Sequence, residues 1–178
     1  LETYLYISPI EFRINLLDKN SSKNFYKNEL KFEKNSKFID LYQLSKFLEE
    51  NIFKIEKLIG KFIENIFLII DSNEVINLSL GIKKKNYTKI INKKYFEILI
   101  TEAKDIIKEK YNDYKIMHIL IDKFLINGNS HIKLKKDFNG EDFGLEIQFI
   151  IVPNFYTTKI EEVLKKFQIK VVGYINGK

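Results

Sequence analysis

Apolar residues in this chain recur with two different periods, and the order in which the two periods alternate leaves few folds open. Near the N-terminus Phe12, Ile14 and Leu16 alternate with polar or outward positions, which is the spacing of a β-strand. A short apolar stretch, Tyr4–Ser8, precedes them, and a weaker one, Phe25–Phe32, follows a polar turn segment. These three stretches predict a three-stranded meander at the start of the chain.

The period then changes to that of a helix. Asp40 is a suitable N-cap, and Gln43 stands three residues later, which is the arrangement of a capping box. Apolar residues recur at helical spacing and form one stripe at Leu41, Leu44, Leu48, Ile52, Ile55 and Ile59. Gly60 follows the stripe and predicts the end of the helix, because glycine readily adopts the left-handed conformation of a C-terminal cap.

The remaining patterns alternate without a regular strand–helix–strand repeat. Further strands are expected at Asn65–Asp71, Ile76–Ile82, Tyr114–Ile126, Leu145–Val152 and Ile169–Ile175, with helices from Asn92 and from a second capping box at Thr158 and Glu161. The whole order, βββα–ββ–α–ββ–αβ, predicts a mixed α+β fold. Its middle part, from Val75 to Val152, is expected to be a strand–helix–strand–strand insert in a domain formed by the two ends of the chain.

Charge and composition restrict the partners and the compartment. The net charge of +6 would suit nucleic acid, but 24 acidic residues are interleaved with the lysines, so compositional bias is the preferred explanation and nucleic acid is not an expected partner. The chain has no cysteine, which excludes disulfides and thiolate metal sites and fits a cytoplasmic location. The longest apolar run, Ile66–Ile70, is far shorter than a membrane helix, and Leu1–Ser8 lacks the features of a signal peptide.

The sequence contains no recognisable catalytic motif. No serine stands in a nucleophile elbow, and no glycine-rich phosphate loop is present. The two histidines, His118 and His131, have no neighbour at metal-ligand spacing, so no metal is expected. His118 lies in an apolar run and is predicted to be a hydrogen-bonded, structural core residue. The chain is therefore not expected to be an enzyme.

Two segments of the predicted insert are candidates for partner binding. The first is the basic turn with Lys83, Lys84, Lys85 and Tyr87, for which the alternatives are a solvated loop and a site for single-stranded nucleic acid. The second is the loop His131–Gly144, which holds two aromatic residues, Phe138 and Phe143. An exposed ring there would be a docking anchor, whereas rings that fold back onto the sheet would cap the core.

The run Lys115–Gly128 resembles a segment of the bacterial cell-division protein FtsA. It keeps the order of a basic residue, apolar residues around His118, an aromatic residue at Phe124 and then Asn127-Gly128, where the family has Asp-Gly. Weaker matches surround it in the same order, at Phe38-Ile39-Asp40-Leu41, Ile90–Lys104, Leu145-Glu146 and Ile169-Lys170-Val171. The resemblance covers nearly the whole chain.

This resemblance implies an actin-like subdomain 1A, a mixed sheet with helices, that carries an inserted subdomain 1C of the SHS2 (strand-helix-strand-strand) type. Subdomain 1A is expected at residues 1–74 and 153–178 and subdomain 1C at residues 75–152. The family acts as a scaffold through protein–protein contacts, both in filament self-contacts and in recruiting division proteins. The partners implied are therefore other division proteins and the chain itself, at the inner face of the membrane if the full protein has the family's anchor.

The chain departs from the family at the first phosphate loop. The matching stretch holds Ser8, Ile10, Glu11 and Arg13, and the Asp, Gly and Thr of the family are gone. Such loops hold phosphate by close backbone approach, which glycine permits and Ile10 does not. No cofactor is expected, although the family binds ATP. The second actin-like half, with the FtsZ site and the membrane helix, is expected to lie outside this sequence.

Two alternatives to an FtsA-like scaffold remain open at this point. A PilM-like pilus-assembly protein shares the same fold and the same kind of insert. A basic nucleic-acid-binding module is the alternative from another class.

Overall fold

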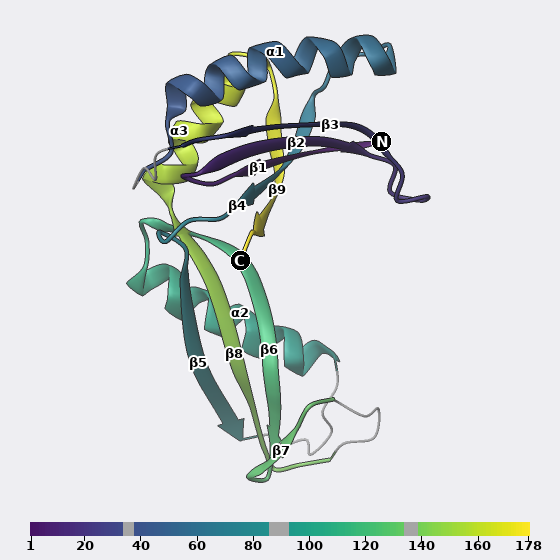
Figure 1. The fold of residues 1–178 in the computed structure, drawn as a ribbon. Helices are drawn as coiled ribbons and strands as arrows, with labels where there is room; N and C mark the ends of the chain where they lie inside the picture. The colour runs from purple at the N-terminus through teal and green to yellow at the C-terminus, as the bar shows by residue number, and fades with distance from the viewer. Residues whose placement is uncertain (34–37, 86–92, 134–138) are drawn as a thin grey trace. The chain divides into compact units, whose positions relative to one another are not determined.

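The computed structural model describes residues 1–33, 38–85, 93–133 and 139–178 (Figure 1). The chain divides into two compact units. Unit 1 consists of Leu1–Val75 and Pro153–Lys178, and unit 2 consists of Ile76–Val152.

Unit 1 is built on a mixed five-stranded sheet with the order β3-β2-β1-β4-β9. Its strands are β1 (Glu2–Ile7), β2 (Glu11–Leu17), β3 (Asn24–Lys31), β4 (Asn65–Ile70) and β9 (Lys170–Asn176). The first three pair antiparallel, which confirms the predicted meander, and β4 then runs parallel to both β1 and β9. The apolar side chains that alternate along a strand lie on one face of the sheet and are buried there, as Phe12, Ile14 and Leu16 are on β2.

Two helices pack in unit 1, α1 (Leu41–Ile59) and α3 (Asn154–Lys165), and they contact each other. The ends of α1 are as predicted: the Asp40 carboxylate accepts hydrogen bonds from the N–H groups of Tyr42 and Gln43, both at 3.0 Å, and Gly60 closes the helix at φ 72°. The predicted start of α3 at Thr158 is wrong. This helix begins one turn earlier, directly after Pro153, whose extended backbone with φ near −60° leads into the first turn.

A buried asparagine ties α1 to β3 at the edge of the sheet. The Asn51 side-chain oxygen accepts hydrogen bonds from the Tyr26 hydroxyl at 2.6 Å and from the Asn28 amide at 2.7 Å. The Asn51 amide donates to the Phe47 carbonyl at 2.5 Å. Because these contacts satisfy the amide away from water, Asn51 can be fully buried and can fix where the helix sits on β3.

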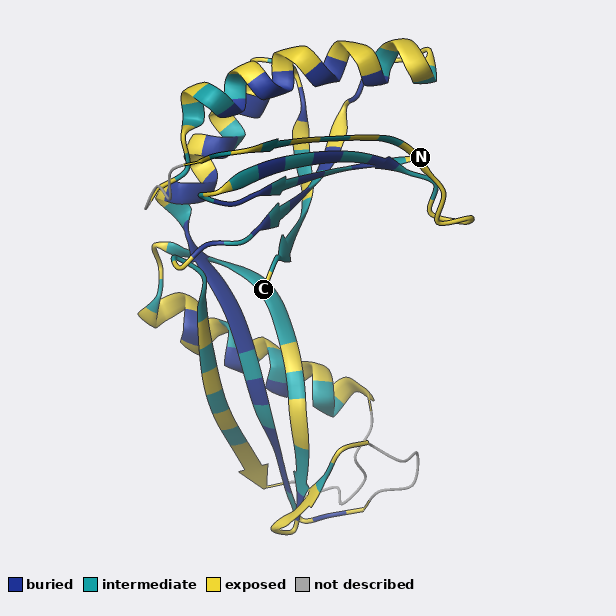
Figure 2. Cartoon of the chain, in the orientation of Figure 1, coloured by how far each residue is buried: buried dark blue, intermediate teal, exposed yellow. Residues whose placement is uncertain are grey.

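Unit 2 is a four-stranded sheet with the order β5-β8-β6-β7 and one helix, α2 (Lys93–Lys110). Its strands are β5 (Ile76–Lys85), β6 (Tyr114–Ile126), β7 (Asn129–His131) and β8 (Asp142–Pro153). The central strand β8 is the most buried of the four (Figure 2). Its core side chains pack with Leu99, Ala103 and Ile107 of α2.

Unit 2 differs from the sequence-based expectation at one hairpin. The sequence predicts no strand between Ile126 and Leu145, but β7 pairs back onto β6 and β8 already begins at Asp142. Asn127 and Gly128 form the two-residue turn, with φ of 49° and 84°. An Asn-Gly pair favours this tight hairpin turn because both residues tolerate positive φ.

Candidate functional site

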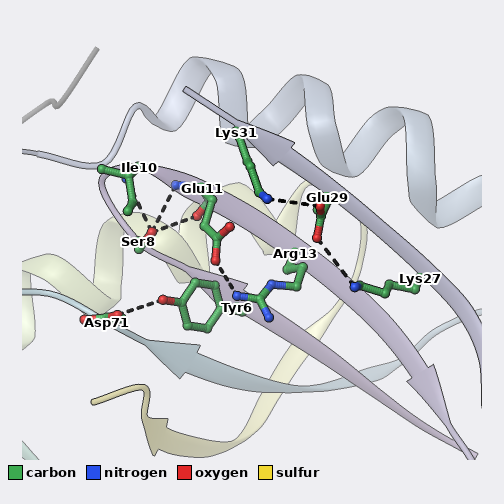
Figure 3. A network of polar contacts seen from close by, with 9 residues as sticks. All are labelled: Tyr6, Ser8, Ile10, Glu11, Arg13, Lys27, Glu29, Lys31 and Asp71. Carbon is green, nitrogen blue, oxygen red and sulfur yellow. Dashed lines mark hydrogen bonds and ion pairs between the residues drawn. The ribbon is translucent and has the colours of Figure 1, made fainter. Parts of the chain in front are cut away.

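The stretch that the sequence predicts to be a degenerate phosphate loop begins as a closed hairpin turn between β1 and β2 (Figure 3). The Ser8 hydroxyl oxygen accepts hydrogen bonds from the N–H groups of Ile10 at 3.3 Å and Glu11 at 3.0 Å. The Ser8 hydroxyl and the Ser8 N–H both donate to the Glu11 carbonyl, at 3.1 and 3.0 Å. Pro9 has no N–H group, and the other N–H groups of the turn donate within the turn, so none of them is offered to an anion.

A polar network continues from this turn along the sheet (Figure 3). Arg13 forms an ion pair with Glu11, and its guanidinium carbon lies 4.6 Å from the centre of the Tyr6 ring. The Tyr6 hydroxyl donates to the Asp71 carboxylate at 2.7 Å. Asp71 follows β4, and its N–H donates to the carbonyl of Ile7 on the parallel strand β1 at 3.0 Å. The network therefore joins the carboxyl ends of β1 and β4, where open sheets with parallel strands commonly bind ligands.

The charges of this network compensate one another. Burial, followed by the hydrogen bond to Asp71, raises the pKa of Tyr6 to about 12, so its hydroxyl stays a donor at neutral pH. The hydrogen bond to Glu11 raises the pKa of Arg13. On β3, Glu29 lies between Lys31 at 3.4 Å and Lys27 at 3.6 Å. Each of these cations thus faces a carboxylate, which leaves little positive potential for a phosphate group.

The structure brings all four residues of the predicted degenerate loop together at this turn: Ser8, Ile10, Glu11 and Arg13. The sequence patterns did not identify Tyr6 and Asp71 as members of this polar network. The signal for Asp71 was its position at the end of the apolar run 65–70, because a polar residue directly after a buried strand often lies at a ligand-facing edge. Tyr6 had no such signal, since its aromatic ring fits the apolar pattern of β1.

The predicted basic turn is in fact the end of a strand. Lys83, Lys84 and Lys85 continue β5 and pair with the residues Asp142–Gly144 of β8. Lys83 lies 3.1 Å from the Asp142 carboxylate, and Lys84 forms an ion pair with Glu102. The sequence suggested a break because three lysines interrupt the apolar alternation, whereas cross-strand pairing and these carboxylates accommodate them. Tyr87 lies outside the described residues.

The aromatic residues of the second candidate segment have different outcomes. Phe143 is fully buried in the core of unit 2, and its ring centre lies 5.8 Å from that of Tyr95. Its proposed role as an exposed docking anchor is therefore wrong, and the alternative in which the ring folds back onto the sheet holds. Phe138 lies outside the described residues.

Neither histidine belongs to a metal centre in the part of the chain that the structure describes, where no group of three or more potential ligands occurs. His118 lies on β6 but is only half-buried and is not a member of the buried core, so the expectation of a core residue is corrected. His131 ends β7 and is half-buried as well. Among residues 1–33, 38–85, 93–133 and 139–178, no helix is long and apolar enough to cross a membrane.

No protein-family model matches this chain, and no curated protein matches its sequence. Among solved structures, a chain of the "PilM-PilN type IV pilus biogenesis complex" is similar over 98% of this chain and 47% of that chain, with a TM-score of 0.59 and 11% sequence identity. The cytoplasmic domain of EpsL from the type II secretion system of Vibrio cholerae gives a TM-score of 0.44 at 9% identity, over 98% of this chain and 54% of that one. A Bacteroides thetaiotaomicron protein described as having an actin-like ATPase fold gives 0.35 at 10% identity, over 98% and 51%.

Only the first of these likenesses is close enough to support a structural argument. It shows that this chain shares the fold of part of a chain in the pilus complex. The chain spans about half the length of the structures it matches.

Proposed function

We propose that this chain is a docking module of an actin-like scaffold protein and that it acts by binding other proteins. The single observation that carries this proposal is the closed turn at Ser8–Glu11. Where an actin-like ATPase needs free backbone N–H groups for phosphate, this turn directs those of Ile10 and Glu11 to the Ser8 hydroxyl. A Cβ atom at position 10 and a carboxylate at position 11 further oppose an approaching phosphate group.

Two assemblies are candidates for the scaffold. The run Lys115–Gly128 supports an FtsA-like protein of the cell-division machinery, with unit 1 as subdomain 1A and unit 2 as the inserted SHS2 subdomain 1C. The fold likeness to the PilM-PilN complex supports a PilM-like protein of pilus assembly. Both assemblies would use the chain as a platform for protein partners, so the docking proposal is common to both.

Photocrosslinking in the native cell would test this function and separate the two assemblies. A photoreactive residue placed at exposed positions of both units would capture neighbouring proteins for identification by mass spectrometry. Capture of division proteins supports the FtsA-like scaffold, and capture of pilus proteins supports the PilM-like one. If the probes capture no specific protein from any site, or if they capture mainly nucleic acid, the docking proposal fails.

A further inference from the structure

The two arms of the β6–β7 hairpin differ in length, and the difference leaves one side of β6 open (Figure 1). β6 has 13 residues, whereas β7 has 3 and pairs with β6 only at Phe124, Leu125 and Ile126. The sheet order β5-β8-β6-β7 places no other strand on that side of β6 among the described residues. Every residue of β6 before Ile126 is at least partly exposed. The side of β6 that runs along Ile116–Ile121 is called the open edge below.

The open edge lacks the features that protect most edge strands. Lysines, prolines and bulges normally keep an edge strand from pairing with another chain. Ile116–Ile121 contains no lysine, arginine, carboxylate, proline or glycine. The Leu120 side chain is 46% exposed. The open edge therefore combines the backbone of a strand with apolar side chains, and cross-strand pairs of such side chains stabilise a sheet.

The other edge strands of the two sheets carry protective features. On β3, Glu29 lies between Lys27 and Lys31 and forms an ion pair with each of them. On β9, the pairing with β4 passes over Val172, which forms a β-bulge. The edge strand β5 ends in Lys83–Lys85. Among the described edge strands, the composition of β6 is thus the one that favours pairing with a further strand.

We propose that the open edge binds an extended segment of another protein, which adds to the sheet of unit 2 as a strand beside β6. This inference rests on the proposed docking function and names the site and the class of partner. Main-chain hydrogen bonds supply the affinity in this mode of recognition, and alternate side chains supply the specificity. Because isoleucine, methionine and leucine line the open edge, the segment should carry uncharged β-branched or aromatic residues at alternate positions. It would lie in line with β7, on the same side of β6.

Amide hydrogen exchange, measured by NMR on the full chain, tests this inference because strand addition has its own exchange pattern. Successive N–H groups of a strand point to opposite sides, so every second amide of residues 116–121 should exchange fast in the free protein. The probe is a short synthetic peptide in which valine and threonine alternate. We expect this peptide to bind with a Kd of about 1 mM and to slow the exchange of the same alternate amides.

Two lysine variants place the binding on one edge of the sheet. Leu120→Lys adds a residue that protects natural edges, and it should weaken peptide binding at least about tenfold. Because this side chain is exposed, the variant should melt at the same temperature as the unmodified chain. Ser79→Lys, at an exposed position of the edge strand β5, is the matched control and should leave peptide binding unchanged. The same peptide with a proline at its centre should bind weakly or not at all, since proline has no N–H to donate.

Three results would overturn the inference: slow exchange of every amide of residues 116–121 in the free protein, no binding of the peptide, or equal effects of Leu120→Lys and Ser79→Lys. Protection that appears without peptide as the protein concentration rises would show that two copies pair through this edge, which would also overturn it. None of these results bears on the capture of proteins by photoreactive residues elsewhere on either unit. The failure of this inference is therefore distinguishable from the failure of the proposed function.

Discussion

The two units of this chain stabilise their interiors in different ways. All the buried polar residues among those described lie in unit 1, at Thr3, Ser8, Asn51, Ser72 and Thr157. The buried core of unit 2 is entirely apolar in the part of that unit that the structure describes. Unit 1 therefore adds directional hydrogen bonds to an apolar core of its own, such as Phe12, Ile14 and Leu16, whereas unit 2 depends on packing against α2. The difference predicts that the two units respond differently to substitutions and to pH.

The largest effect is expected from the apolar core of unit 2. Phe143→Ala removes a fully buried ring from this core and should cost about 3–5 kcal/mol of stability. Hydrogen exchange should then increase in peptides of unit 2 and stay unchanged in unit 1. Leu120→Ala on β6, where the side chain is 46% exposed, is the control and should have little effect. A stable Phe143→Ala variant would show that this core is not held by packing.

A smaller effect is expected from the polar crosslink of unit 1. Asn51→Ala leaves the Tyr26 hydroxyl and the Asn28 amide without their acceptor, which should cost about 1–3 kcal/mol. The increase in hydrogen exchange should now appear in α1 and β3. The exposed Asn65 provides the control substitution to alanine. If exchange increases equally in unit 2, the two interiors are not independent.

As the pH rises into the alkaline range, the stability of unit 1 should fall before the stability of unit 2. Burial is the largest cause that raises the pKa of Tyr6 and of Tyr156, each to about 12. A raised tyrosine pKa means that the folded state favours the neutral hydroxyl. The contribution to stability is therefore complete below the unfolded pKa of about 10 and is lost as pH rises through about 12.

Denaturant unfolding at pH 8 and pH 11 measures this loss. Tyr6→Phe and Tyr156→Phe should each reduce the difference between the two pH values. At pH 8 Tyr156→Phe should cost almost nothing, because its buried hydroxyl has no hydrogen-bond partner among the residues that the structure describes. Ser72 lies close enough to influence the pKa of this hydroxyl, so a cost of about 1 kcal/mol would instead indicate a hydrogen bond between the two.

The smallest effect is expected at the closed turn. Ser8→Ala removes the acceptor for two N–H groups and the donor to the Glu11 carbonyl, and it should cost about 0.5–1.5 kcal/mol. The backbone hydrogen bond from Ser8 to Glu11 remains in the variant, which limits the loss. Ser79→Ala on β5, an exposed serine of unit 2, should be neutral in the same thermal melts. Equal melting shifts for both serines would contradict the account of the turn.

The sequence predicts those parts of the fold that local patterns specify. The cap at Asp40, the stop at Gly60 and the alternation on β2 each follow from one or two residues and their neighbours. The errors arise where the local structure depends on a segment that is distant in the sequence. Lys83–Lys85 form a strand because β8 pairs with them, and Phe143 is buried because α2 covers it. The hairpin at Asn127-Gly128 could have been found from that pair alone.

Sequence patterns predict only part of the candidate site. The loss of the phosphate-loop residues is visible in the sequence, but the closure of the turn by Ser8 depends on hydrogen bonds that the sequence does not specify. The link from Tyr6 to Asp71 joins residues 65 positions apart, so it depends on the parallel pairing of β1 with β4.

Isothermal titration with Mg-ATP tests the central claim most directly, because the proposed function requires that the N–H groups of Ile10 and Glu11 bond Ser8 instead of a phosphate group. We predict no binding heat at nucleotide concentrations up to about 1 mM, for the unmodified chain and for Ser8→Ala alike. A dissociation constant below about 1 mM, which corresponds to more than about 4 kcal/mol of binding free energy, would contradict the claim.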